Sequence, residues 1–145
     1  MARVRRHGGA MSLVTLDVDH FKKINDGNGH AVGDRVLQAV ARECREILRE
    51  EDTVARLGGD EFVLLLTATG SLEANKVAER LRMAFAAVEI PTETNPALHF
   101  TASIGVAALT PDDASIDDLL LRADKALYAA KQAGRNTVHV DNGPQ

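Results

Sequence analysis

The stretch Val54-Ala-Arg-Leu-Gly-Gly-Asp-Glu-Phe-Val-Leu-Leu-Leu66 decides how this chain folds. Its first part, Val54 to Leu57, is predicted to form a short strand, and Phe62 to Leu66 is predicted to form a longer apolar strand. Gly58-Gly59 between them indicates a hairpin, because a two-residue turn needs positive φ angles. The stretch therefore predicts an antiparallel strand pair with an acidic tip.

A buried strand is predicted ahead of this hairpin, from Leu13 to Val18, with Asp17 and Asp19 at its C-terminal end. If this strand lies beside the hairpin, Asp17 converges with Asp60 and Glu61. Carboxylates grouped in this way suit Mg²⁺, which prefers oxygen ligands and shares them with substrate phosphates. Each short motif alone is weak evidence, since D-x-D is commonly a solvated strand end and G-G-D commonly only a turn.

The rest of the pattern predicts helices packed on a mixed sheet. Gly105 marks a bulge or a close backbone approach in a later strand. The order of elements is typical of an α/β (α+β) layer. The remaining predicted elements are a loop at Asp26–Gly29, helical stripes at Val36–Leu48, at Leu72–Phe85 with Ser71 as cap, and at Ile116–Leu127, a loop at Pro91–Pro96, and strands at His99–Ala107 and Thr137–Val140.

Composition limits the class of protein. The 145 residues fit one domain, and 45% hydrophobic residues provide a core. The formal net charge of −4 argues against a general nucleic-acid binder. Cys44 is the only cysteine and lies on a helical stripe, so we expect a core residue and no internal disulfide. No stretch is apolar over the length of a membrane span, and we expect a cytoplasmic protein.

The motifs together resemble one family. Gly58-Gly-Asp-Glu-Phe62 is the literal signature of the GGDEF family of diguanylate cyclases. Further resemblances to the family's motifs lie at Asp17–Asp26, Gly29–Asp34 and Ala123–Asn136. The similarity runs from about residue 13 to residue 140, so the chain is identified as a single GGDEF domain over residues 1–145. The resemblance implies a five-stranded mixed sheet flanked by helices, similar to the palm of nucleotidyl cyclases and polymerases.

The same resemblance implies a metal site and an acidic catalytic pair. Asp17, the Val18 carbonyl and Asp60 match the ligands of Mg²⁺, for which Mn²⁺ is an alternative. Asp60 and Glu61 match the family's catalytic acids. Glu61 would either assist the metals or activate the 3′-hydroxyl.

A GTP site is also implied by the resemblance. Asn25 and Asp34 match the pair that reads guanine, and a carboxylate can accept from two guanine N–H groups that adenine does not offer together. Lys131 and Arg135 match cations that hold the triphosphate, although both could merely favour a helix C-terminus. The implied GTP-binding residues are Phe21, Lys22, Asn25, Asp34, Gly59, Lys131 and Arg135.

A second nucleotide site is implied by Arg49-Glu-Glu-Asp52, which five residues separate from Gly58. This is the position of the family's inhibitory R-x-x-D site, where cyclic di-GMP binds and stops turnover. The planar fork of arginine suits phosphate or a guanine edge. Arg80 is a further candidate for this inhibitory product site. The alternative interpretation is an ordinary charged helix end.

The implied reaction joins two GTP molecules into cyclic di-GMP across a homodimer and releases two pyrophosphates. Family members carry a D-x-L-T-G-L-x-N-R segment and a helix before the first strand. Met1–His7 resembles the end of that helix, so we expect a domain truncated at its N-terminus and without a sensory domain. Two alternatives are a non-catalytic cyclic di-GMP receptor and a regulatory interaction module. The intact Gly58–Phe62 favours catalysis.

Overall fold

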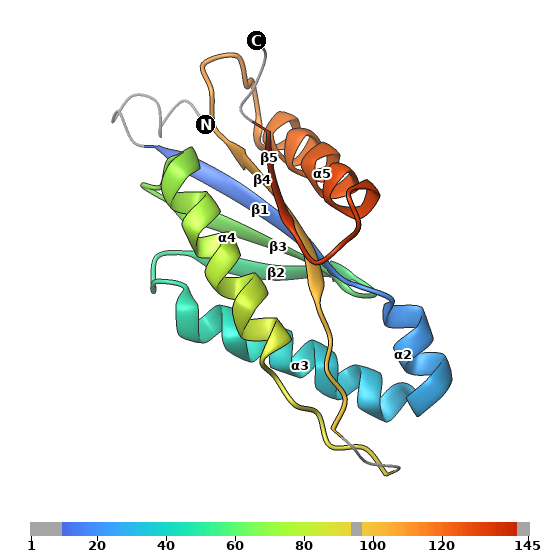
Figure 1. The fold of residues 1–145 in the computed structure, drawn as a ribbon. Coiled ribbons are helices and arrows are strands. Elements are labelled where there is room, and N and C mark those ends of the chain that lie inside the picture. The colour runs from blue at the N-terminus through green and yellow to red at the C-terminus, as the bar shows by residue number, and fades with distance from the viewer. Residues whose placement is uncertain (1–9, 94–96, 142–145) are drawn as a thin grey trace.

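A computed structural model describes residues 10–93 and 97–141, so the expectation about Met1–His7 lies outside the described residues. It shows one mixed sheet with helices on both faces, which confirms the predicted fold class (Figure 1). The strands are β1 Met11–Val18, β2 Thr53–Gly58, β3 Glu61–Thr67, β4 Ala102–Ala108 and β5 Val138–Asp141, and the helices are α2 Phe21–Asn28, α3 His30–Ile47, α4 Ser71–Ala86 and α5 Ile116–Gln132. No helix in these ranges is both long and apolar enough to span a bilayer.

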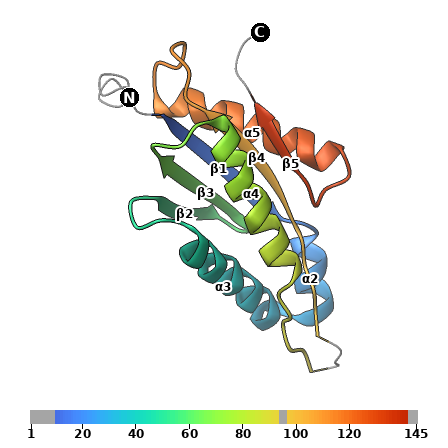
Figure 2. The ribbon, with the colours of Figure 1, turned by 60° about the vertical axis from the view of Figure 1, so that its left-hand side comes forward.

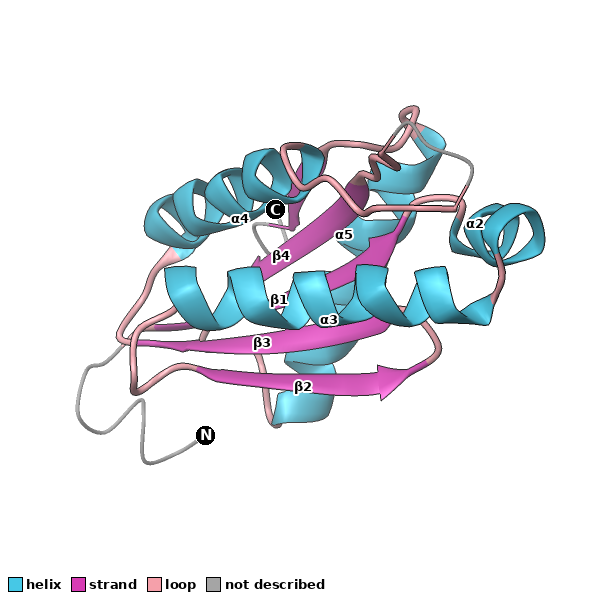
Figure 3. Ribbon diagram, turned by 90° about the horizontal axis from the view of Figure 1, so that it is seen from below, coloured by secondary structure: helices cyan, strands magenta, loops and turns pink. Residues whose placement is uncertain are grey.

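The central strand β1 determines the layers. The strand order is β2-β3-β1-β4-β5; β1 runs antiparallel to β3 and β4, and β5 runs parallel to β4. Because side chains alternate along a strand, Val14 and Leu16 of β1 join the core beneath α3 and α4, whereas Leu13 and Thr15 contact α5. The same alternation puts Asp17 on the α5 face. Figures 2 and 3 show α3 and α4 on one side of the sheet and α5 on the other.

Helix α5 lies unusually close to the sheet at Gly105. A Cβ atom at this position would lie 2.3 Å from the Ala123 carbonyl oxygen and 2.3 Å from the Leu127 nitrogen. Only glycine fits there, which confirms the predicted close backbone approach. Thr15 Oγ1 also donates to the Ala123 carbonyl at 3.2 Å. These contacts fix α5 against β1 and β4.

Arg122, the seventh residue of α5, joins this helix to neighbouring segments, and its side chain is only 15% exposed. Its guanidinium contacts Asp113 at 2.6 Å and Asp141 of β5 at 3.3 Å, and it donates to the Ala108 carbonyl. Burial alone would raise the pKa of Asp113, but the hydrogen bonds and charge of Arg122 lower it. Asp113 therefore stays ionised and keeps this contact at neutral pH.

Cys44 is fully buried in the larger core cluster, and burial raises the pKa of its thiol to about 12. The thiol therefore stays protonated and acts as a small core side chain, as predicted.

Two predictions about turns are wrong. The predicted hairpin between β2 and β3 is confirmed, but its two-residue turn lies one position later, at Gly59-Asp60, because β2 continues to Gly58, which pairs with Glu61. Residues 26–28 belong to α2 and are not a loop, because the backbone pattern continues until the Gly29 amide donates to the Asn25 carbonyl at 2.8 Å. A single residue, Gly29, with a φ of 88°, separates α2 from α3.

The predicted entry to α4 is also wrong. The N-cap is Gly70 and the helix begins at Ser71. Leu72 is 69% exposed, so it does not face the core as the helical pattern predicted. The next strand starts later than predicted, since β4 begins at Ala102 while Leu98 forms an isolated bridge with Ile90.

Candidate active site

Acidic side chains meet where β1 ends and β3 begins, on the α5 side of the sheet. The antiparallel register places Asp17 opposite Glu61, and the hairpin turn brings Asp60 next to Glu61. The sequence analysis expected Asp17 to lie near Asp60 and Glu61 if the first strand lies beside the hairpin, and β1 does pair with β3. The charge of Asp17 acts on both Asp60 and Glu61.

A fourth carboxylate, Asp124 of α5, joins this group and was not predicted from the sequence. Besides burial, the negative charge of Asp124 raises the pKa of Glu61, so the two carboxylates lie close together. It lies seven residues before Lys131, which is two helical turns, so the spacing alone could have placed both on one face of α5. Burial raises the pKa of Asp60, Glu61 and Asp124, and the negative charge of Asp17 raises each of them further.

Lys131 partly balances this charge. Its ammonium pairs with Asp17 Oδ2, and it opposes the rise in the pKa of the neighbouring acids. Three buried side-chain polar atoms in the described part of the chain have no hydrogen-bond partner: Asp17 Oδ1, Asn25 Oδ1 and Asp124 Oδ1. All three belong to residues of this acidic group or of the cavity beside it. Buried polar atoms are rarely left unpaired, so their concentration here indicates a site that needs a ligand.

The carboxylates fit a hard divalent cation. No group of three or more His, Cys, Asp or Glu side chains in residues 10–93 and 97–141 is placed to hold a metal ion. The set implied by the resemblance has only two carboxylates, Asp17 and Asp60, with the Val18 carbonyl. An unpartnered Asp17 oxygen and the raised pKa of Asp60 show negative charge that a cation would stabilise.

A cavity of about 400 Å³ adjoins the acidic group. It brings together most of the residues that the resemblance assigned to metal and GTP, with Asp19 and His20 in addition. Gly59 borders open space, since a Cβ atom there would meet nothing within 4 Å. The lining residues are Asp17, Val18, Asp19, His20, Phe21, Lys22, Asn25, Asp60, Lys131 and Arg135.

Asp34 lines a different cavity, of about 530 Å³, which also contains Phe62 and Arg56. Asn25 and Asp34 are nevertheless linked through Gly33. A Cβ atom on Gly33 would lie 1.8 Å from Asn25 Oδ1, so the amide of Asn25 packs directly against the residue before Asp34. A side chain at position 33 would force the Asn25 amide to move, so Gly33 helps to set the position of Asn25, a role that the sequence analysis did not assign.

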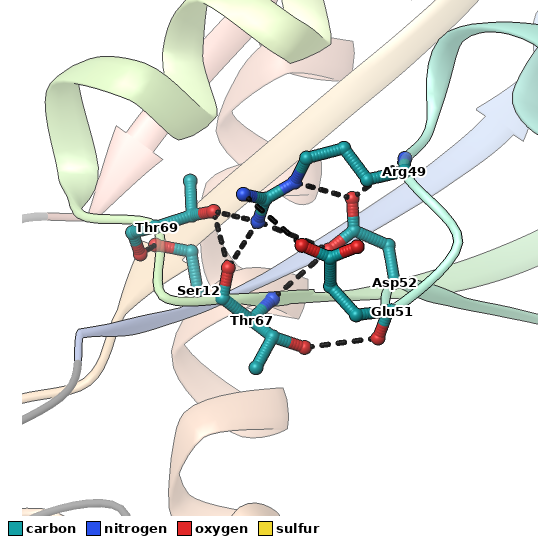
Figure 4. A network of polar contacts seen from close by, with 6 residues as sticks. All are labelled: Ser12, Arg49, Glu51, Asp52, Thr67 and Thr69. Carbon is teal, nitrogen blue, oxygen red and sulfur yellow. Dashed lines mark hydrogen bonds and ion pairs between the residues drawn. The ribbon is translucent and has the colours of Figure 1, made fainter. Parts of the chain in front are cut away.

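Arg49 and Asp52 form a polar network beyond the end of α3 (Figure 4). Arg49 contacts the Asp52 carboxylate at 3.4 Å, Thr69 Oγ1 at 3.0 Å and the Thr67 carbonyl. Asp52 also accepts from the Thr67 amide at 3.1 Å, and its side chain is 4% exposed, against 48% for Arg49. Asp52 therefore supports the local fold, whereas the Arg49 side chain remains half accessible.

This network lies far from the acidic group. Thr67 pairs with Met11 at one end of β1, and Asp17 pairs with Glu61 six residues along. At about 3.3 Å per residue, the two sites are roughly 20 Å apart. Arg80 is exposed on α4 and is not among the residues of the Figure 4 network.

The fold and this site define a palm-like domain with an acidic sheet edge, beside which cationic residues line a cavity. A family model described as "Diguanylate cyclase, GGDEF domain" matches residues 1–137. The chain belongs to the GGDEF family.

Named relatives agree with this assignment. The chain is 48% identical to diguanylate cyclase DgcP of Pseudomonas aeruginosa, covering 97% of this chain and 21% of that protein. It is 47% identical to diguanylate cyclase DgcM of Escherichia coli, covering 88% of this chain and 30% of that protein. The chain thus spans a third or less of these two relatives.

Solved structures show the same fold. The active GGEEF domain of a diguanylate cyclase from Vibrio cholerae superposes with a TM-score of 0.91 at 35% identity, covering 99% of this chain and 90% of that one. The GGDEF domain of DgcB from Caulobacter crescentus, in complex with c-di-GMP, gives 0.89 at 32% identity, covering 96% and 82%.

Proposed function

We propose that this domain condenses two GTP molecules into cyclic di-GMP and releases two pyrophosphates. The observation that carries the proposal is the cluster of unpartnered polar atoms beside a cavity lined by Lys131 and Arg135. The intact Gly58–Phe62 signature and the names of the relatives support the same reaction. GTP is a cytoplasmic nucleotide, and we place the reaction in the cytoplasm.

Each group has a role in this proposal. Asn25 and Asp34 read the guanine edge, and Phe21 and Gly59 border the nucleotide. Lys22, Lys131 and Arg135 hold the triphosphate. Lys131 leaves Asp17 for the phosphates when the nucleotide binds, which exchanges one anionic partner for another.

Asp17, the Val18 carbonyl and Asp60 would hold Mg²⁺ or Mn²⁺, and Glu61 acts beside them on the 3′-hydroxyl or the metal. When bound, the metal neutralises phosphate charge and makes the hydroxyl more acidic. The product has two identical halves, so two copies of the chain related by a twofold axis each supply one GTP. In the reaction, each 3′-hydroxyl loses its proton, and its oxygen forms a bond to the α-phosphorus of the other nucleotide as the bond from that phosphorus to pyrophosphate breaks.

Incubation with GTP and Mg²⁺, followed by chromatography of the nucleotides, tests the proposal. The expected product is cyclic di-GMP. A protein that binds cyclic di-GMP but makes none would be a receptor, and one that does neither would be an interaction module.

We predict that Asp34→Ala weakens GTP binding by about 10-fold or more and leaves ATP binding nearly unchanged. The carboxylate offers a charged acceptor to guanine, and hydrogen bonds of this kind contribute about 1.5–3 kcal/mol. Calorimetry with both nucleotides measures the preference. Glu46→Ala, an exposed acid on the same helix, is the control. An unchanged GTP-to-ATP ratio in Asp34→Ala would remove Asp34 from the guanine site.

We also propose that Arg49 and Asp52 bind cyclic di-GMP and inhibit turnover, with Arg80 as a further candidate. The half-exposed guanidinium of Arg49 supports this proposal, because it can exchange its bonds to Thr67 and Thr69 for a phosphate or guanine edge. The roughly 20 Å to the acidic group, estimated from strand length, makes the two sites separable by mutation.

Arg49→Ala is predicted to raise the cyclic di-GMP concentration that gives half-inhibition by about 10-fold or more, because an arginine–phosphate contact is lost. The initial rate without product should change little. Arg42→Ala removes a guanidinium of similar exposure (52%) outside the network and serves as control. Equal product affinity in Arg49→Ala and wild type would contradict the inhibitory site. Asp52→Ala is a poorer test, because it also breaks the bond to the Thr67 amide.

A further inference from the structure

Asp19 is an almost fully buried carboxylate, 5% exposed, at the edge of the candidate active site. Its Oδ1 accepts from Ser103 Oγ at 2.6 Å, and its Oδ2 accepts from Thr101 Oγ1 at 2.6 Å. Oδ2 also accepts from the backbone N–H of Asn136 at 2.9 Å. Both oxygens are therefore committed to the protein, so Asp19 is poorly suited to bind a metal or nucleotide itself.

The last of these bonds ends on a strained turn. Helix α5 closes with Gly134 at a φ of 114°, and the Arg135 amide donates back to the Ala130 carbonyl at 3.1 Å. Arg135 and Asn136 follow with φ angles of 66° and 46°, in the left-handed region. This region is unfavourable for a residue such as arginine and is better tolerated by asparagine. Such a conformation persists only where surrounding contacts impose it.

Among the described residues, the side chains of two other segments contact this turn. One is the Asp19 carboxylate, which is charged and buried, so its hydrogen bond to the Asn136 amide is strong. The other is Arg82 of α4, which donates to Asn136 Oδ1 at 3.0 Å. Between Lys131 and Asn136 the chain carries Arg135, which lines the same cavity as Asp17 and Asp60.

We propose that Asp19 is a positioning residue that fixes the Gly134–Asn136 turn and thereby aims Arg135 at the triphosphate. The inference rests on the proposed function, in which Lys131 and Arg135 hold the phosphates. It gives the second aspartate of Asp17-Val-Asp19 a role, although both of its oxygens accept hydrogen bonds from the protein. The residue controls binding of phosphate and leaves recognition of guanine unchanged.

The test compares two guanine nucleotides in the full chain with Mg²⁺ present. One is the α,β-methylene analogue of GTP, which cannot release pyrophosphate, and the other is GMP. Asp19→Asn is expected to weaken binding of the triphosphate analogue by about 10-fold, the effect of losing a charged hydrogen bond, while GMP affinity changes less than about twofold. If Asp19 had only a structural role, Asp19→Asn would weaken the binding of both nucleotides to the same extent or of neither.

A double-mutant cycle shows whether the effect passes through Arg135. If it does, Asp19→Asn adds less than about twofold to the loss already caused by Arg135→Ala. Full additivity would overturn the inference. Ser103→Ala is the matched control, because it removes a hydrogen bond from the other oxygen of Asp19 and keeps the bond to Asn136. It is expected to lower the melting temperature and to keep the preference for the triphosphate.

Asn136 offers a second route if Asp19→Asn does not fold. Asn136→Gly and Asn136→Ala both lose the Arg82 contact, but only alanine is strained at a φ of 46°. Alanine is expected to weaken triphosphate binding relative to glycine, and equal affinities would overturn the role of the turn.

Wild-type protein that binds the triphosphate analogue no better than GMP would contradict the proposed function itself. If wild-type protein prefers the triphosphate analogue to GMP and Asp19→Asn keeps the same preference, only the role of Asp19 is contradicted.

Discussion

Asp60→Asn is expected to lower the rate of cyclic di-GMP formation by at least about 1000-fold. The substitution keeps the shape of the side chain but removes one of the two carboxylates that would hold the metal. Charge stabilisation by a metal contributes several kcal/mol at the transition state, and each 1.36 kcal/mol corresponds to about tenfold in rate. Product formation under saturating GTP and Mg²⁺ measures the effect.

The same substitution should not destabilise the fold. Burial and the charge of Asp17 raise the pKa of Asp60, so its ionised form disfavours the folded state. In wild type, this penalty grows as the pH rises from the unfolded-state pKa to the raised folded-state pKa of Asp60, and it is complete above that value. Below the unfolded-state pKa the penalty is absent. Without metal, Asp60→Asn is therefore expected to melt at or slightly above the wild-type temperature near neutral pH.

Asp112→Asn, an exposed aspartate in the loop before α5, is the control for a change of charge alone. It should retain wild-type turnover. Equal rates for Asp60→Asn and wild type would remove Asp60 from the metal site. A large fall in the melting temperature of Asp60→Asn would instead show that its charge stabilises the domain.

Forced dimerisation is expected to raise the rate per domain by about 100-fold or more at low nanomolar protein concentration. Two GTP-loaded copies must meet face to face, and separate domains meet rarely at that dilution. A tether raises the effective concentration to roughly millimolar and can increase apparent affinity by about 10²–10⁴. A parallel coiled coil fused ahead of Met1 provides the tether. The unfused domain should show a specific activity that increases with its own concentration.

The control is the same fusion with polar residues at the core positions of the coiled coil, which keeps the length but prevents pairing. Thermal melts of all forms separate tethering from a change in stability. A high specific activity of the unfused domain that stays constant with dilution would contradict this prediction. It would mean either that the domain is already a stable dimer or that the two sites do not act face to face.

The acidic sheet edge was predictable because it depends on local patterns. A buried strand ending in Asp17 and a glycine hairpin carrying Glu61 need only be neighbours, and their antiparallel pairing in the structure places the two residues opposite each other. The close packing at Gly105 was predictable for a similar reason, since glycine inside a strand commonly marks such a contact.

The roles of Asp124 and Asp19 were not predictable from local patterns, because they depend on how α5 and the turn after it pack against the sheet. Asp124 joins Glu61 only because α5 packs tightly over Gly105, and Asp19 reaches Asn136 across 117 residues of sequence. Local composition also misled at residues 26–28, where Asp-Gly-Asn is typical of a turn. There the helical backbone bonds continue to the Gly29 amide, which donates to the Asn25 carbonyl.

The account depends on one reaction, and its stoichiometry is the most direct test. Phosphorus NMR of wild-type protein with GTP and Mg²⁺ should show two pyrophosphates formed for each cyclic di-GMP. ATP should give neither product, and Asp60→Asn should give neither from GTP. Wild-type protein that binds GTP at micromolar concentration or better, yet forms no cyclic di-GMP even when tethered as a dimer, would contradict the proposed function.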